Sequence, residues 1–162
     1  SRVNQYSGAV FLERTDSTHV QVMPEYGAFA PVESSTIPKA YLVHAESAAV
    51  VGPMLAAHGV SFESMIKAES LRVESFAVDS VLVSDRPFQQ IQEVTLTGLW
   101  SENDIHFPTG SLLISMEQPL SRLAFYLLEP RSDDGLVNWG FFGEDFAAGA
   151  IFPVFRVPLG NP

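Results

Sequence analysis

Residues 111–142 read SLLISMEQPLSRLAFYLLEPRSDDGLVNWGFF and contain, in order, the patterns of a strand, a helix and a polar loop. The apolar run that ends before Gln118 predicts a short, largely buried strand over residues 111–116. Pro119 predicts the start of a helix, because proline at the first helical position loses no hydrogen bond. Pro130 predicts its end. Five apolar positions share one helical face and predict packing against a sheet: Leu120, Leu123, Ala124, Leu127 and Leu128.

The loop after this helix contains more acidic and aromatic residues than a connection requires. Its Asp-Asp-Gly sequence is ordinary for a turn, and clustered aromatic residues commonly fill the core beneath a long loop. The alternative is a platform that binds a sugar or a peptide. We take the loop as the candidate contact surface, with no catalytic residue and no metal ligand assigned, formed by Glu129, Arg131, Asp133, Asp134, Trp139, Phe141 and Phe142.

Length, charge and composition exclude several classes of function. The 162 residues predict a single domain that buries roughly 70% of its unfolded surface. The absence of cysteine excludes thiol nucleophiles, disulfides and cysteine-based zinc sites. Because the net charge is −10 and the nine basic residues are scattered, we expect binding to neither nucleic acid nor anionic membranes. No apolar run approaches the roughly 18 residues that membrane insertion needs. We expect a soluble protein; its compartment stays open, with export as part of a longer protein as one option.

The N-terminal region alternates extended and irregular patterns. The chain starts at Ser1 rather than at a methionine, so we expect a piece of a longer protein. Residues 9–14 and 19–23 predict a β-hairpin. The proline-containing residues 24–38 predict an extended connection or an edge strand, because proline cannot donate a hydrogen bond within a central strand. Residues 40–43 predict a short strand.

Residues 45–58 are rich in alanine and predict the first of two helices. Gly52 and Pro53 interrupt the pattern, so we expect a kink or two shorter helices. Gly59 is a suitable C-terminal cap, and His58 next to it suits the negative end of the helix dipole. An extended segment over residues 60–66 follows.

The remaining sequence is dominated by strand patterns. Asn103 and Asp104 predict a turn, and Gly98 predicts a bulge. In the last strand Phe152 and Val154 are expected inside and Arg156 outside. The short, regularly spaced strands predict an α+β, mainly β protein with antiparallel β-sandwich-like sheets and two short helices. These strands are expected over residues 70–83, 91–100, 105–107 and 151–157.

Few residue patterns in the chain indicate a reaction. The four histidines His19, His44, His58 and His106 lack the spacing that zinc sites require. Neither a Gly-x-Ser-x-Gly sequence nor a phosphate-binding glycine loop occurs. Paired carboxylates for acid–base hydrolysis or for calcium remain an alternative, although the pattern of an EF-hand is absent. The candidate carboxylates are Glu129, Asp133, Asp134, Glu144 and Asp145.

Several strings resemble the C-terminal, non-catalytic region of large bacterial zinc carboxypeptidase-like proteins of the carboxypeptidase A type. The most specific string comprises QPL at 118–120, LLEP at 127–130, SDDGLV at 132–137, Trp139 and the pair FF at 141–142. The similarity covers most of the chain from about Pro38. Further matches are PKAYLV at 38–43, Leu55 with HGV at 58–60, FPTGS at 107–111 and FPVFRV at 152–157.

The resemblance implies an accessory domain, formed by residues 1–162, of a larger parent protein that is a carboxypeptidase-like peptidase. In that family zinc is held by a His-x-x-Glu pair and a distant histidine in an upstream catalytic domain. This chain has no His-x-x-Glu, so no catalytic residue transfers to it and zinc is expected only in the parent. The implied partner is the upstream catalytic domain of the same polypeptide. The alternatives are a carbohydrate- or peptide-binding module and a hydrolase that uses the acidic loop.

Overall fold

The computed structural model describes residues 1–14, 16–31, 33–143 and 146–160, which belong to two compact units, Ser1–Ser35 and Thr36–Pro162. In the first unit β1 (Arg2–Val3) pairs antiparallel with β2 (Val10–Phe11). The hairpin predicted between residues 9–14 and 19–23 is therefore wrong. The Asn4 side chain accepts hydrogen bonds from the N–H groups of Tyr6 and Ser7, which forms a turn that brings β2 back to β1 instead.

The second unit is built on a six-stranded sheet in the order β4-β7-β3-β8-β5-β6. Every pairing within it is antiparallel. The predicted class, α+β and mainly β with antiparallel sheets and two short helices, is confirmed. The strands are β3 (Ala40–Val43), β4 (Glu63–Ser64), β5 (Glu69–Val83), β6 (Val94–Phe107), β7 (Leu112–Ser115) and β8 (Val154–Val157), and the helices are α1 (Ala45–Ala57) and α2 (Ser121–Leu128).

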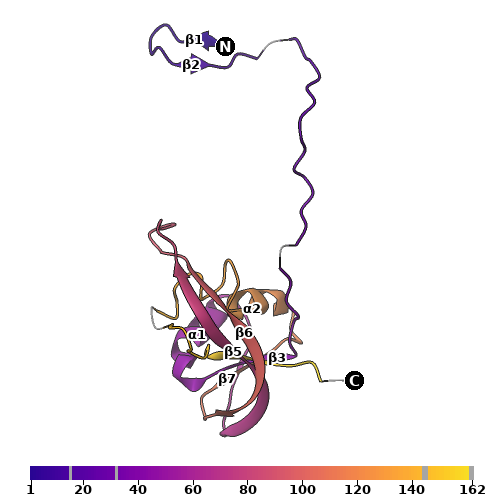
Figure 1. The fold of residues 1–162 in the computed structure, drawn as a ribbon, viewed down its shortest axis with the longest axis vertical. Coiled ribbons are helices and arrows are strands. Elements are labelled where there is room, and N and C mark those ends of the chain that lie inside the picture. The colour runs from indigo at the N-terminus through magenta and orange to yellow at the C-terminus, as the bar shows by residue number, and fades with distance from the viewer. Residues whose placement is uncertain (15, 32, 144–145, 161–162) are drawn as a thin grey trace. The chain divides into compact units, whose positions relative to one another are not determined.

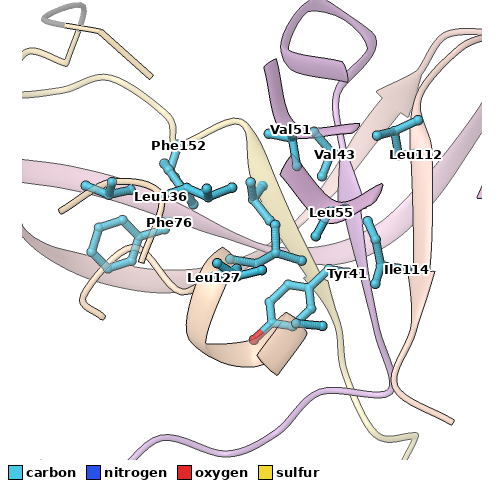
Figure 2. Packing of buried hydrophobic residues seen from close by; sticks show 14 of the residues in the cluster. Tyr41, Val43, Val51, Leu55, Phe76, Leu112, Ile114, Leu127, Leu136 and Phe152 are labelled. Atoms are coloured by element: carbon cyan, nitrogen blue, oxygen red, sulfur yellow. The ribbon is translucent and has the colours of Figure 1, made fainter. Parts of the chain in front are cut away.

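Alternating side chains divide the core between the two faces of this sheet. On β3, Tyr41 and Val43 point into the larger cluster, whereas Leu42 points into the smaller one, as the two-residue period of a strand requires. Residues of α1, α2 and the following loop cover the larger cluster, so helices and a loop form the layer opposite the sheet (Figure 2). They include Val51, Leu55, Ala124, Leu127, Leu128, Leu136 and Val137.

Helix α1 runs from Ala45 to Ala57 as one helix that includes Pro53, so the predicted division into two shorter helices is wrong. The predicted cap is present: Gly59 has φ +73° and donates to the Ala56 carbonyl, while the Val60 N–H donates to that of Leu55. This paired pattern ends a helix firmly. Helix α2 begins after Pro119, at Ser121.

Strands β5 and β6 form a long antiparallel hairpin (Figure 1). The predicted turn at Asn103 is wrong, because this residue pairs with Val73 inside the hairpin and its side-chain amide donates to Ser75 Oγ at 2.8 Å. The bulge predicted at Gly98 on β6 lies instead on the partner strand β5, where the register shifts between Val78 and Ser80. Gly98 lies opposite Val78, where an added Cβ would approach the Ala77 carbonyl oxygen to 2.1 Å.

Candidate binding site

The predicted contact surface starts at Glu129, immediately after α2, and this end of it is buried. Arg156 Nε donates to Glu129 Oε1 at 2.8 Å, and Arg156 Nη2 forms the second bond of a bidentate ion pair. The side chains are only 7% and 8% exposed. Arg156 therefore points inward, which corrects the prediction that it lies outside: its charge is neutralised by a carboxylate 27 residues away in sequence.

Two aromatic residues complete this buried ion pair. The Tyr41 hydroxyl donates to Glu129 Oε1, and the Arg156 guanidinium carbon lies 3.9 Å from the centre of the Trp100 ring, a cation–π contact. Burial, followed by the nearby Glu129 charge, raises the pKa of Tyr41 far above its ordinary value. This network joins β3, β8 and the end of α2, and it engages both oxygens of the Glu129 carboxylate. It is a structural element of the core.

Further along the same loop, ten residues after Glu129, a compact series of turns positions Trp139. The Leu136 N–H donates to the Leu127 carbonyl at 3.0 Å, which fixes the loop to α2. Asn138 fixes it to β6, because the Val94 N–H donates to the Asn138 carbonyl at 3.0 Å. The Trp139 indole N–H donates to Asp134 Oδ1 at 2.5 Å. The half-buried indole ring is thereby held by a hydrogen bond to its edge.

Trp139 forms one wall of an open pocket of about 740 Å³. The other wall comes from the turn end of the β5–β6 hairpin and from the connection between its strands. Most of the lining residues are apolar or glycine, and two carboxamide side chains, Gln90 and Gln92, supply polar groups. The lining comprises Val81, Val83, Gln90, Ile91, Gln92, Val94, Trp139, Gly140, Gly143 and Phe146.

The connection that carries Gln90 contains a tight turn. Phe88 and Ile91 exchange two N–H···O hydrogen bonds of 2.9 Å. Between them Gln89 and Gln90 have φ values of 49° and 71°. Residues other than glycine and asparagine rarely adopt this backbone region. The Phe88 ring lies 6.2 Å from that of Trp139. This turn and Trp139 thus face each other at the pocket.

The structure separates the other predicted contact residues. Arg131, Asp133 and Asp134 are exposed. Phe141 is 44% exposed and lies outside the pocket lining. Phe142 packs against Phe146 and Phe152 at ring distances of 5.8 and 5.3 Å, so its ring belongs to the core. Glu144 and Asp145 lie outside the described residues.

Sequence reasoning missed the pocket residues on β5, β6 and the turn. Val81, Val83 and Val94 appeared only as strand formers, and Gln89-Gln90 carries none of the glycine or asparagine signals of a tight hairpin turn. The available signal was Phe88 next to Pro87 in an otherwise polar connection. Only the fold brings these residues beside Trp139.

The histidines have separate, local roles. His58 Nδ1 lies 2.8 Å from the Met54 carbonyl oxygen at the end of α1, as its position predicts. His106 Nδ1 lies 3.3 Å from Ser70 Oγ. Within the described part of the chain, no group of three His, Cys, Asp or Glu residues is arranged to hold a metal ion. These residues do not fit the zinc site of the family that the sequence resembles. Neither α1 nor α2, the helices of the described residues, has the length and apolar character to cross a membrane.

Comparison with known proteins finds similarity to fungal carboxypeptidases. Carboxypeptidase 2 of Trichophyton tonsurans is 26% identical over 149 residues, which is 90% of this chain and 27% of that protein; the values for Trichophyton equinum are the same. Carboxypeptidase 2 of Trichophyton rubrum is 28% identical over 127 residues, 78% of this chain and 23% of that protein. No family model matches, and no solved structure matches significantly. The chain spans about a quarter of the length of these relatives and is similar to one part of a carboxypeptidase.

Proposed function

We propose that the chain is a non-catalytic accessory domain of a zinc carboxypeptidase-like protein. In this proposal it lies C-terminal to the catalytic domain of the same polypeptide and packs against it or shapes access to its active site. Zinc and the catalytic residues belong to that other domain. The observation that carries the proposal is the similarity to carboxypeptidases, which extends over 90% of this chain but only 27% of the relative.

The unit Ser1–Ser35 supports a packing partner of this kind. Large apolar side chains normally gather in a core, and groups of them in water mark interaction surfaces. Val20 and Val22 are each 96% exposed and alternate with Gln21 as in a strand with one apolar side. The exposed apolar side chains of this unit are Val3, Tyr6, Val10, Phe11, Leu12, Val20, Val22, Met23, Tyr26 and Phe29.

The similarity includes much of this unit. A match over 90% of 162 residues leaves out about 16 residues in all. Even if all of these lie at the N-terminus, residues 17–35 belong to the matched region. The exposed apolar side chains of Val20 and Val22 therefore lie in a region that the longer carboxypeptidase shares. A domain of the same polypeptide is the simplest partner that would cover them.

Two measurements test the proposal. The 162-residue chain, incubated with zinc and with peptides that have a blocked N-terminus and a free C-terminal carboxylate, should release no C-terminal residue. Turnover by this chain would overturn the non-catalytic assignment. In the longer polypeptide, Val22→Asp should lower the melting temperature and the peptidase activity, because it places a charged carboxylate in the apolar contact with the other domain. Gln21→Asp, which adds the same charge on the opposite side of the extended segment, is the matched control. Equal effects of both substitutions would contradict the packing role.

A hydrolase that uses the acidic loop is less well supported. Such a mechanism needs two carboxyl groups that face a common cleft. Glu129 is instead held in an ion pair with Arg156, and the lining of the pocket contains no carboxylate among the described residues. Asp134 is engaged by the indole of Trp139.

A further inference from the structure

We propose that the pocket between the 88–91 turn and Trp139 binds peptide segments that carry a large apolar side chain with basic residues beside it. This binding site goes beyond the proposed accessory function and does not depend on it. It makes a prediction for the 162-residue chain alone, with a readout that involves no peptidase activity.

The chemistry of the walls favours an apolar side chain. Val81, Val83 and Val94 present branched aliphatic groups, and Phe146 and Trp139 add aromatic surface. Covering these surfaces with a large apolar side chain is favourable, because it removes apolar area of both partners from water. The volume of about 740 Å³ lies within the usual range for ligand sites and accommodates a bulky side chain with adjoining backbone.

The polar groups of the pocket match the backbone of a peptide. Gln90 and Gln92 each offer two amide donors and a carbonyl acceptor, the same groups that a peptide bond needs as partners. Gln90 reaches the pocket from a turn whose two central residues have positive φ. Glycine or asparagine would occupy this turn with less strain. Strained backbone of this kind concentrates at sites that bind ligands, and here it presents a carboxamide to the pocket.

The charges around the pocket favour a basic ligand. Glu93 lies between two lining residues in the sequence, and Asp134 holds Trp139 through its hydrogen bond. Asp85 and Arg86 flank the other side of the turn. These four groups give three negative charges and one positive charge, and the whole chain carries a net charge of −10. A ligand with lysine or arginine beside its apolar side chain is therefore attracted, and an acidic one is repelled.

The probe for a test is the blocked peptide acetyl-GKGFGKG-amide with a fluorescent label, titrated with the full 162-residue chain. Replacing its phenylalanine by alanine, or its lysines by glutamates, should weaken binding about tenfold or more. The Trp139→Ala variant should lose about tenfold in affinity, since stacking and burial on an indole commonly contribute that much. Phe141→Ala, which removes an exposed aromatic ring of the same loop outside the pocket, should bind within about twofold of the parent chain.

Two further measurements keep the test decisive. If Trp139→Ala does not fold, as judged by circular dichroism, Val83→Lys replaces it: Val83 is 53% exposed, so a lysine there should leave the fold intact and repel the basic peptide. NMR spectra should show the Trp139 indole N–H signal shifting with peptide while that of Trp100 does not. Absence of binding, equal affinity in the pocket variants, or binding of a neutral oligosaccharide in place of the peptide would overturn the proposal.

Discussion

The two ends of the loop between α2 and Phe142 contain similar residue types and have different environments. At its start Glu129 is 6% exposed and bonds to an arginine and a tyrosine that are buried with it. Five residues later Asp134 is exposed, and its carboxylate accepts a hydrogen bond from the edge of a half-buried indole. The first carboxylate belongs to the core, whereas the second stands beside an open pocket.

The difference shows that the surroundings of a carboxylate decide its role. A buried charge is tolerated only when an opposite charge and hydrogen bonds satisfy it, and removing one member leaves the other uncompensated. An exposed carboxylate keeps its hydration and contributes little to stability. Variants at the two ends should therefore separate stability from binding, with large stability effects at the Glu129 end and binding effects at the Trp139 end.

The largest effect is expected for Arg156→Met, which should lower the free energy of unfolding by about 3–5 kcal/mol because the Glu129 charge stays buried without its partner. Urea denaturation followed by circular dichroism measures the change. Arg122→Met is the control, since Arg122 is an exposed arginine on α2, and it should change stability by less than about 0.5 kcal/mol. Adding Glu129→Gln to Arg156→Met should recover part of the loss. A loss below about 1 kcal/mol for Arg156→Met would contradict the structural role of the ion pair.

A close backbone approach in the middle of the loop should give the next largest effect. At Gly135 an added Cβ would lie 2.7 Å from the Tyr126 carbonyl oxygen and 2.8 Å from Ser132 Cβ. Gly135→Ala should therefore cost about 1–3 kcal/mol in unfolding free energy, the usual range for overpacking. At Gly160 an added Cβ would meet nothing within 4 Å, so Gly160→Ala should be nearly neutral. Equal melting temperatures for the two variants would contradict the tight packing of the loop on α2.

A third expectation concerns alkaline pH. Because burial raises the pKa of Tyr41 above its ordinary value of 10.0, the folded state favours the protonated phenol. The contribution of the protonated Tyr41 phenol to the free energy of unfolding is fully present below about pH 10. It is lost as the pH rises further, since the unfolded chain then releases this proton more readily. Tyr41→Phe should cost about 1–3 kcal/mol at neutral pH, the range for a hydrogen bond to a charged group.

The measurement for Tyr41 compares urea denaturation at about pH 8 and about pH 11. The stability difference between the parent chain and Tyr41→Phe should shrink at the higher pH, because only the parent chain loses the contribution of the phenol. Tyr126→Phe is the control: Tyr126 is 50% exposed, and its substitution should leave the pH dependence unchanged. A constant difference for Tyr41→Phe would show that the phenol does not titrate with unfolding.

Features of the fold that depend on local sequence were predictable. The strand Ala40–Val43 and the cap at Gly59 follow from residue types within a few positions. Predictions failed where distant residues decide the outcome. Asn103 stays in a strand because Ser75 accepts its side-chain hydrogen bond, and Arg156 turns inward because Glu129 neutralises it. Neither partner is identifiable from the sequence around the residue itself.

The candidate site was predictable only on one side. The density of acidic and aromatic residues pointed to the loop that contains Trp139, and this residue does line a pocket. The other wall depends on the register of β5 and β6, which places Val83 opposite Val94, and on a turn formed by two glutamines. Their sequence lacks the glycine or asparagine that ordinarily indicates such a turn. Sequence patterns thus identified a loop, whereas the pairing of two strands forms the pocket.

The smallest stability effect is expected at Asp134, and it completes the comparison with Glu129. Asp134→Ala removes the acceptor of the Trp139 indole N–H, yet both groups can reach water, so the unfolding free energy should change by less than about 0.5 kcal/mol. The indole should reorient more freely, which tryptophan fluorescence anisotropy would report, with Asp133→Ala as the control for the lost charge. Glu129→Ala, the equivalent change at the buried end, should cost about 3–5 kcal/mol. Similar losses for the two alanine variants would mean that Asp134 is part of the folded core, and the division of this loop into a structural end and a binding end would then be wrong.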